Sequence, residues 1–176
     1  GGGTEPARRQ PTLQDMMSHS AGVTYGAQGT GELYKRYPSQ SSAAAEAMTG
    51  TQLLDTLGGL PLFYQPGTKW EYSFGMDVAG LAVEAVTKQR LGDYLQQYLW
   101  GPLKMTDTSF AVPTAKAARI AKPLPNDPLT SQPQTARDAT AVLKFDCGGG
   151  CASGTAMDYL RFAQMLLNKG TLDGTR

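Results

Sequence analysis

Apolar residues recur at helical spacing in two segments with clear boundaries, residues 73–86 and 91–100. In the first, Ser73 can cap the free backbone amides at the start of a helix. Its apolar stripe consists of Val78, Leu81, Ala82, Ala85 and Val86. The stripe of the second segment consists of Leu91, Leu95, Tyr98 and Leu99. Each pattern predicts one amphipathic helix.

Three further helices are predicted from start and stop signals. One begins after Thr12, whose hydroxyl can cap residues 13–17, and a second covers residues 43–57 and ends at Gly58. A third covers residues 155–168. Its expected apolar face is Tyr159, Phe162, Ala163, Leu166 and Leu167. These helices give the chain a mainly helical character.

The remaining segments contain many turn residues. Residues 24–42 are rich in glycine and serine and predict a loop with one helical turn at 32–37. Five prolines in residues 111–138 exclude long regular structure, although 114–120 can form a short helix. A short extended piece is expected at residues 70–72. The length of the chain fits a single domain.

Composition and charge restrict the possible partners. The chain has 176 residues, of which 40% are hydrophobic and 18% charged, so it can bury a core. Its formal charge of +1 is spread singly, which argues against a nucleic-acid partner. No apolar run approaches the roughly 20 residues that span a bilayer, so membrane insertion is not expected. The chain begins without Met and stops inside an expected turn, so we expect both ends to be cuts.

Two cysteines, Cys147 and Cys151, are separated by three glycines. Free thiols and a local disulfide both fit this spacing. A metal site is disfavoured because two thiolates and the distant His19 do not supply four ligands. No metal or other cofactor is predicted, and the redox state and the cellular compartment stay open.

The usual signatures of a nucleophilic serine are missing from these residues. No serine lies in a Gly-x-Ser-x-Gly elbow, and none is followed three residues later by lysine. The single histidine, His19, lies in a helix-ending turn, where a structural hydrogen bond to the turn's backbone is the favoured role. Gly148–Gly150 lacks the Lys-Ser/Thr of a phosphate-binding loop, so tight packing is the better interpretation.

Four segments, taken in order, resemble the serine β-lactamase superfamily, which includes class C β-lactamases, DD-peptidases and β-lactamase-like carboxylesterases. Residues 12–22 are similar to its helix and His-Thr-Ser-Gly turn, and 66–73 to its Pro-Gly-x-x-x-x-Tyr-Ser approach to the catalytic tyrosine. Residues 101–110 resemble its Pro-Leu-Gly-Met-x-x-Thr-x-Phe signature, and 148–162 its Gly-Gly-x-x-Ser-Thr-Ala-x-Asp helix entry. The resemblance implies that residues 1–176 form a single helical subdomain of an α+β fold, with short extended pieces at 70–72 and near Phe145. The predicted fold is therefore mainly α with short β pieces.

The resemblance also implies a catalytic role for Tyr72. Such a phenol, with a reference pKa of about 10, must lie near a cation to exchange protons at neutral pH. In the family that cation is the lysine of Ser-x-x-Lys, which would precede Gly1, whereas the Lys-Thr-Gly or His-x-Gly strand would follow Arg176. Without the resemblance, a buried structural tyrosine would be the expected interpretation of Tyr72.

Two further residues are predicted to bind substrate. Phe74 stands where the β-lactamases and peptidases carry the asparagine of Tyr-x-Asn, and it cannot donate the amide hydrogen bond of those enzymes. It resembles the apolar residue of the carboxylesterases, although a core phenylalanine is an equally good interpretation. Tyr25 is expected to line the substrate entrance, with a plain exposed loop tyrosine as the alternative.

The predicted function is part of a carboxylesterase that works through an acyl-serine intermediate, with Tyr72 as general base and acid. The isolated chain is expected to be inactive. One alternative parent is a β-lactamase or DD-peptidase, so the expected small-molecule partner is an ester or a β-lactam. The other alternative is a non-catalytic assembly module, which forms a homo-oligomer or binds a complementary chain through its exposed sheet-docking face.

Overall fold

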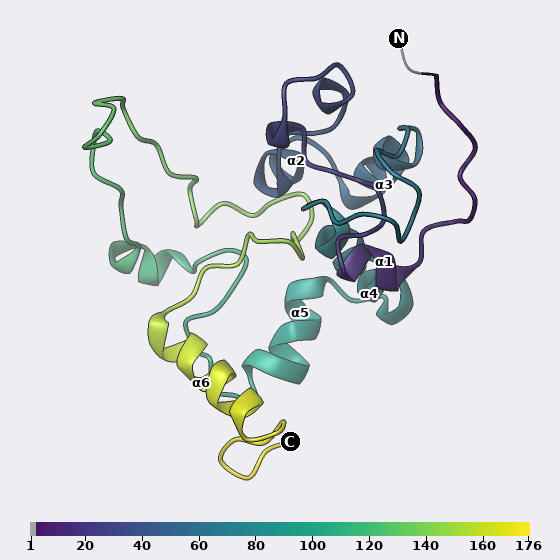
Figure 1. The fold of residues 1–176 in the computed structure, drawn as a ribbon. Helices are drawn as coiled ribbons and strands as arrows, with labels where there is room; N and C mark the ends of the chain where they lie inside the picture. The colour runs from purple at the N-terminus through teal and green to yellow at the C-terminus, as the bar shows by residue number, and fades with distance from the viewer. Residues whose placement is uncertain (1–2) are drawn as a thin grey trace. The chain divides into compact units, whose positions relative to one another are not determined.

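The computed structural model describes residues 3–176, which divide into two compact units. The first unit contains the chain up to Leu99 together with Leu143–Cys151, and the second contains Trp100–Val142 and Ala152–Arg176. Figure 1 labels the helices. The described residues are helical apart from loops and isolated bridges, which confirms the mainly α prediction.

In the first unit the α-helices are α1 (Leu13–Met17), α2 (Ser41–Ala47), α3 (Gly50–Gly58), α4 (Gly75–Thr87) and α5 (Leu91–Leu95). Short 3-10 turns cover Gly26–Gln28 and Tyr34–Arg36, and a π-helical turn, Gln96–Trp100, continues α5 and ends at the first residue of the second unit. The second unit contains the 3-10 helix Thr114–Arg119 and α6 (Ala156–Leu167). The turns at 34–36 and 114–119 lie where the sequence predicts them.

The expected extended pieces do not pair into strands within residues 3–176. The bridges present there are isolated, at Ser109 with Ser153, Asn126 with Pro133 and Leu172 with Thr175. Around residues 70–72 the Glu71 amide donates to the carbonyl of His19 at 2.8 Å. An extended segment becomes a strand only where a neighbour continues the ladder. Here the neighbouring segment is the turn at His19 and not an extended chain, so no β-ladder forms around residues 70–72.

The predicted helix at 43–57 is wrong in one respect, because the chain forms two helices there. The Thr49 side chain accepts from the amide of Gln52, and the Gln52 side chain accepts from the amide of Thr49. This capping box satisfies the amides that begin α3 and separates it from α2. The same device starts α1 at Thr12, as predicted.

Helix α4 begins two residues after Ser73, whose hydroxyl accepts from the amide of Gly75 at 3.2 Å. Its buried positions are Gly75, Asp77, Gly80 and Leu81, whereas Val86 is 83% exposed. The predicted stripe is therefore wrong at its C-terminal end. Glycine, and not a bulky side chain, makes the tightest contacts, because an added Cβ on Gly75 would overlap the Met16 carbonyl of α1.

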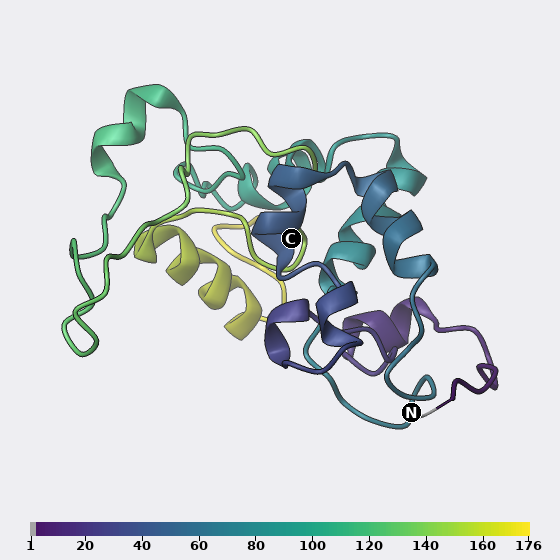
Figure 2. The same cartoon turned by 90° about the horizontal axis from the view of Figure 1, so that it is seen from above.

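Helix α6 starts as predicted, with the Thr155 hydroxyl accepting from the amide of Asp158. Polar contacts hold the helix in the second unit. The Asp158 carboxylate accepts from the amide of Asp107 and the hydroxyl of Thr108, both at 2.8 Å, and Arg161 donates to the carbonyl of Leu103. Figure 2 shows α6 as one continuous helix.

The apolar face predicted for α6 is mostly solvent-exposed. Tyr159, Leu166 and Leu167 are 70%, 58% and 77% exposed. Helical spacing marks an apolar face without showing what covers it.

Among the described residues, no helix is both long and apolar enough to cross a membrane.

The close approach of α1 and α4 predicts the effect of one substitution. Gly75→Ala should lower the free energy of unfolding by about 1–3 kcal/mol, because the new methyl group meets backbone that cannot rotate away. Urea unfolding followed by circular dichroism would measure the change.

Gly58→Ala is the matched control for this variant. An added Cβ at Gly58, at the end of α3, meets nothing within 4 Å. The control should be neutral or gain up to about 1 kcal/mol from helix propensity. Equal stability of the two variants would contradict the contact at Gly75.

Candidate functional site

A cavity of about 230 Å³ lies in the first unit. Residues from four parts of the chain line it, including Tyr25, Gln40, Ser41, Tyr72, Gly149 and Gly150. Two residues predicted from the sequence, Tyr25 and Tyr72, therefore meet at one cavity. The third, Phe74, does not line it.

Tyr72 is 45% exposed and stands among other aromatic rings. Its ring centroid lies 4.9 Å from that of His19, 5.5 Å from Tyr25 and 6.3 Å from the stacked Trp70. The neighbouring Glu71 is held to the turn by its hydrogen bond to the His19 carbonyl. The Tyr72 side chain is thus positioned by packing and remains accessible to a ligand.

The His19 ring makes a hydrogen bond to a side chain, so the prediction that it bonds to the turn's backbone is wrong in its partner. Its Nδ1 lies 3.1 Å from the hydroxyl oxygen of Ser73. That oxygen already accepts from the Gly75 amide, so the Ser73 hydroxyl hydrogen can be donated to Nδ1. Burial lowers the pKa of His19, which favours the neutral ring that this arrangement needs.

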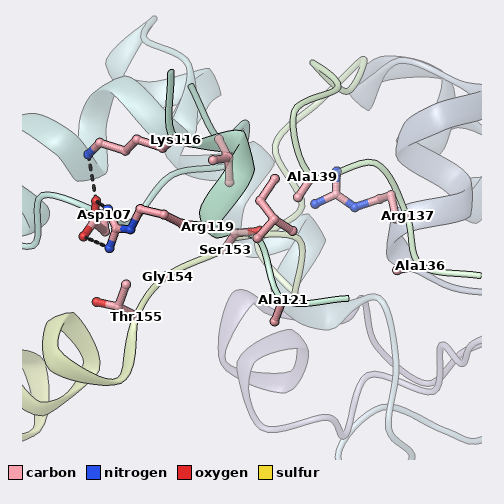
Figure 3. Close-up of a pocket in the computed structure, with 12 residues that line it drawn as sticks. Asp107, Lys116, Arg119, Ala121, Ala136, Arg137, Ala139, Ser153, Gly154 and Thr155 are labelled. Atoms are coloured by element: carbon pink, nitrogen blue, oxygen red, sulfur yellow. Dashed lines mark hydrogen bonds and ion pairs between the residues drawn. The ribbon is translucent and has the colours of Figure 1, made fainter. Parts of the chain in front are cut away.

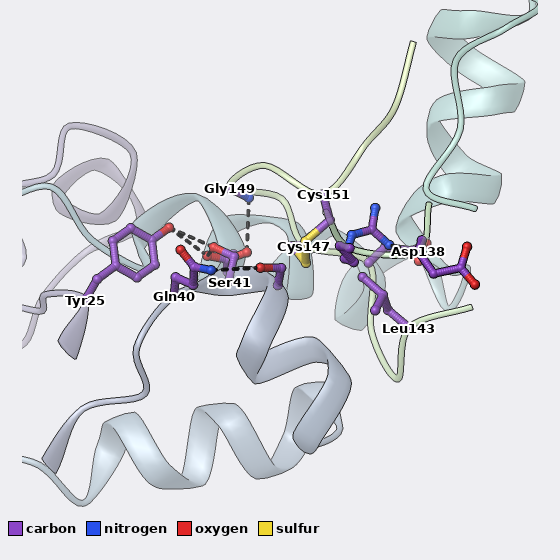
Figure 4. The surroundings of a disulfide bond; sticks show 12 residues. Tyr25, Gln40, Ser41, Asp138, Leu143, Cys147, Gly149 and Cys151 are labelled. Atoms are coloured by element: carbon purple, nitrogen blue, oxygen red, sulfur yellow. Dashed lines mark hydrogen bonds between the residues drawn. A yellow bond between two sulfur atoms is a disulfide. The ribbon is translucent and has the colours of Figure 1, made fainter. Parts of the chain in front are cut away.

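Tyr25 belongs to a buried polar network that centres on Asp77. Figure 4 labels Tyr25, Ser41 and Gly149, which belong to this network. The Asp77 carboxylate accepts from Ser41 Oγ at 2.7 Å, from the Tyr25 hydroxyl at 3.2 Å and from the Gly149 amide at 3.1 Å. The Tyr25 and Ser41 hydroxyl oxygens are also 2.8 Å apart. Tyr25 is only 6% exposed, so it is not the exposed loop tyrosine of the alternative interpretation.

Asp77 is a residue that the sequence analysis missed. It is completely buried, and an acid within an otherwise apolar helix pattern was the available signal. Burial raises the pKa of Asp77, although its three hydrogen-bond donors oppose this effect. Burial likewise raises the pKa of Tyr25 well above its usual range. Tyr25 therefore remains a protonated donor at neutral pH.

Phe74 has no exposed surface in this chain. Its ring packs edge to face against Tyr25, with the centroids 4.4 Å apart. The structure thus fits the core interpretation of this residue, and its contact with substrate stays a prediction. Phe74 supports the cavity by packing behind one of its walls.

A disulfide between Cys147 and Cys151 closes the glycine loop at the cavity (Figure 4). Of the alternatives left open by the sequence, the structure contains the local disulfide, with both residues buried. An added Cβ on Gly149 would lie 2.7 Å from Asp77 Oδ2 and 2.9 Å from the Tyr25 hydroxyl. An added Cβ on Gly148 would likewise overlap the Met76 carbonyl, so the packing interpretation fits Gly148 and Gly149, whereas Gly150 has nothing within 4 Å.

The segment that leads into this loop is anchored by an ion pair. Arg90 Nε donates to Asp146 at 2.8 Å, and the amide of Gly92 donates to the other carboxylate oxygen at the same distance. Asp146 is buried, so the pair fixes the backbone ahead of Cys147.

Among residues 3–176 no group of three His, Cys, Asp or Glu side chains could hold a metal ion.

Three serines line the cavity with Tyr72, namely Ser39, Ser41 and Ser42, and Ser41 is the buried one. It is 7% exposed, and its hydroxyl donates to Asp77 and lies 2.8 Å from the Tyr25 hydroxyl oxygen. Neither partner is a base with free access to solvent. The arrangement positions the loop and helix around the cavity, and it does not resemble an activated nucleophile.

The network predicts how stability depends on pH. A carboxyl group whose pKa is raised by folding takes up its proton preferentially in the folded state, so folding gains stability as the pH falls through that pKa. Asp77→Asn should cost about 1–3 kcal/mol at neutral pH, because the amide group faces hydrogen-bond donors. The stability gap between wild type and variant should then widen between pH 7 and 3.8.

Urea unfolding of both proteins across this pH range would measure the gap. Asp55→Asn, at an exposed position of α3, is the matched control and should show a small, constant difference. A gap that narrows in acid would show that the three donors outweigh burial, and the inferred direction would be wrong.

Comparisons with known proteins agree with this architecture. The family model described as Beta-lactamase matches residues 2–176. Protein Rv1367c of Mycobacterium tuberculosis is 34% identical over 177 residues, which cover 98% of this chain and 43% of that protein. Lovastatin esterase of Penicillium rubens is 32% identical over 130 residues, covering 70% of this chain and 31% of the relative.

A solved structure shows the same fold. It is EstCE1, described as a hydrolase with promiscuous acyltransferase activity, with a TM-score of 0.76 at 21% identity. The match covers 94% of this chain and 48% of the EstCE1 chain. This chain thus spans less than half of the length of each of these three proteins. It belongs to the β-lactamase family, within the serine β-lactamase-like superfamily, and forms a helical portion of that fold.

Proposed function

We propose that this chain is part of a carboxylesterase that forms an acyl-serine intermediate, with Tyr72 as general base and acid. The observation that carries this proposal is the position of Tyr72 at the cavity. Its phenol is half-exposed and held among the rings of His19, Tyr25 and Trp70. A group that exchanges protons with a reacting atom needs both this access and a fixed orientation.

The second tyrosine at the cavity is unsuited to that role. Tyr25 is buried, donates to Asp77, and has a pKa raised by burial. Deprotonating it would place two negative charges side by side in a poorly solvated site. We therefore assign proton transfer to Tyr72 and support of the wall to Tyr25.

The serine and lysine of the mechanism would come from sequence outside these 176 residues. The serine would attack the ester carbonyl, Tyr72 would take its proton, and the bond to the alcohol would break as Tyr72 returns that proton. Water would then release the acid from the acyl-serine. The lysine cation beside Tyr72 would lower the free-energy cost of losing the phenol proton at neutral pH.

An ester is favoured over a β-lactam for two reasons. Phe74 occupies the position of the asparagine amide found in β-lactamases and peptidases, and it offers no hydrogen bond to such a substrate. The name of one relative, lovastatin esterase, points to ester cleavage, and EstCE1 is described as a hydrolase. A small-molecule ester is therefore the proposed substrate class.

Labelling of the 176-residue chain tests where the nucleophile lies. After incubation with a fluorophosphonate, the intact mass should be unchanged, and p-nitrophenyl butyrate should not be hydrolysed above background. A stoichiometric adduct lost in Ser41→Ala would place the nucleophile inside the cavity described above. That outcome would overturn the proposal.

Substitution of Tyr72 in a longer chain that includes a Ser-x-x-Lys segment tests its role. Tyr72→Phe should reduce kcat for p-nitrophenyl butyrate by about 100-fold or more with little change in KM, because the ring remains and only the proton carrier is lost. Tyr94→Phe in α5 is the matched control. Full activity of Tyr72→Phe, or faster turnover of a chromogenic cephalosporin than of the ester, would contradict the proposal.

Assembly is a second candidate function, and the exposed face of α6 favours it. Tyr159, Leu160, Leu166 and Leu167 are each more than half exposed on this one helix. Adjacent apolar side chains of this kind mark a surface that binds another protein segment. We propose that it pairs with a second copy when no complementary segment is present.

Sedimentation of the 176-residue chain at micromolar concentrations tests this pairing. A dimer is expected, and Leu167→Glu should shift it towards monomer because it buries a charge in the contact. Gln97→Glu, at an exposed position outside α6, should have no effect. A monodisperse monomer of the unsubstituted chain would exclude self-association.

A further inference from the structure

We propose that the second unit contains a separate binding site for a small organic carboxylate. The site is a cavity of about 420 Å³ between the 3-10 helix Thr114–Arg119, the segment 136–139 and the residues ahead of α6 (Figure 3). Its lining includes Asp107, Lys116, Arg119, Ile120, Arg137 and Ser153. The proposal does not depend on Tyr72 or on any esterase activity.

The lining carries three cationic side chains against one carboxylate. Asp107 accepts from Arg119 Nη1 at 2.9 Å and from Nη2 at 2.8 Å, and Lys116 Nζ lies 2.8 Å from the same carboxylate. These partners hold the pKa of Asp107 well below its usual range, so it stays ionised. The net lining charge is therefore +2, by three positive side chains less one negative.

Arg119 retains hydrogen-bonding capacity for a ligand. Asp107 takes one hydrogen from each Nη atom of Arg119, and each Nη carries a second hydrogen. Arg137, which donates to the Asp138 carbonyl at 3.2 Å, lies across the cavity from the Asp107–Arg119 pair in Figure 3. A carboxylate suits such guanidinium groups because its two oxygens match their planar donors.

The rest of the lining is apolar or small, which restricts the ligand further. Val112, Ile120, Ala121, Ala136 and Ala139 supply hydrocarbon surface next to the cationic groups. The amide and carbonyl of Ser153 are both hydrogen-bonded to Ser109, at 2.8 and 2.9 Å, which fixes this part of the lining. The chemistry fits an anionic head on a short aliphatic body, such as a medium-chain carboxylate.

Calorimetric titration of the 176-residue chain with octanoate tests the site. Arg119→Gln and Arg137→Gln should each weaken octanoate binding by about ten-fold, the effect of losing one charge-assisted hydrogen bond. Arg36→Gln makes the same charge change in the first unit and should leave binding within two-fold. Unchanged affinity in both cavity variants would overturn the proposal.

A steric variant and two further probes separate this site from general attraction of anions. Ala139→Phe should fill the cavity and abolish octanoate binding without changing the charge, while circular dichroism verifies that the fold is retained. Octylamine should not bind, and inorganic phosphate should bind at least ten-fold more weakly than octanoate. No octanoate binding, equal phosphate binding, or full binding by a folded Ala139→Phe chain would each overturn the proposal.

Discussion

The hydrogen-bonded carboxylate of Asp77 is the constraint on which the candidate site depends. It lies in the first turn of α4 and gathers donors from the Tyr25 loop, the start of α2 and the glycine loop. Transfer of an unpaired carboxylate out of water would be prohibitive, so these three segments must stay in place for the fold to tolerate it. The walls of the cavity are therefore set by the same interaction that satisfies a buried charge.

Two further interactions outside the Asp77 hydrogen-bond network hold the glycine loop in place. The disulfide between Cys147 and Cys151 limits the conformations of the glycine loop, and the Arg90–Asp146 pair fixes the backbone ahead of it. Gly149 is then close enough to Asp77 that any side chain would collide with the network. The glycine loop, for which the sequence predicts tight packing, is consequently held by the disulfide, by the ion pair ahead of it and by the contact at Gly149.

Local signals were sufficient to predict much of the secondary structure. Caps at Thr12 and Thr155 operate within one turn of helix, so their chemistry is readable directly from the chain. The break at Thr49 was missed because the strong helix formers on both sides masked a capping box. Which face of a helix is buried depends on distant partners, and this explains why α4 buries glycines and Asp77 in place of Val86.

The candidate site was predictable in part, for the same reason. Tyr72 and Tyr25 were found because the order of motifs resembles a family in which the surrounding segments converge. Asp77 was missed because its three hydrogen-bond donors come from residues that are 36, 52 and 72 positions away in the chain. Burial and hydrogen bonding at that distance cannot be derived from helical spacing alone.

The contrast between the two tyrosines shows how environment can separate identical chemical groups. Tyr25 and Tyr72 lie 5.5 Å apart between ring centroids and line the same cavity. Burial and an adjacent carboxylate keep the Tyr25 phenol protonated, whereas the ring of Tyr72 is held by aromatic packing and its surface remains half-exposed. The difference in environment is the reason for the proposed division of roles, because the buried Tyr25 can only shape the wall whereas the accessible Tyr72 can reach a ligand.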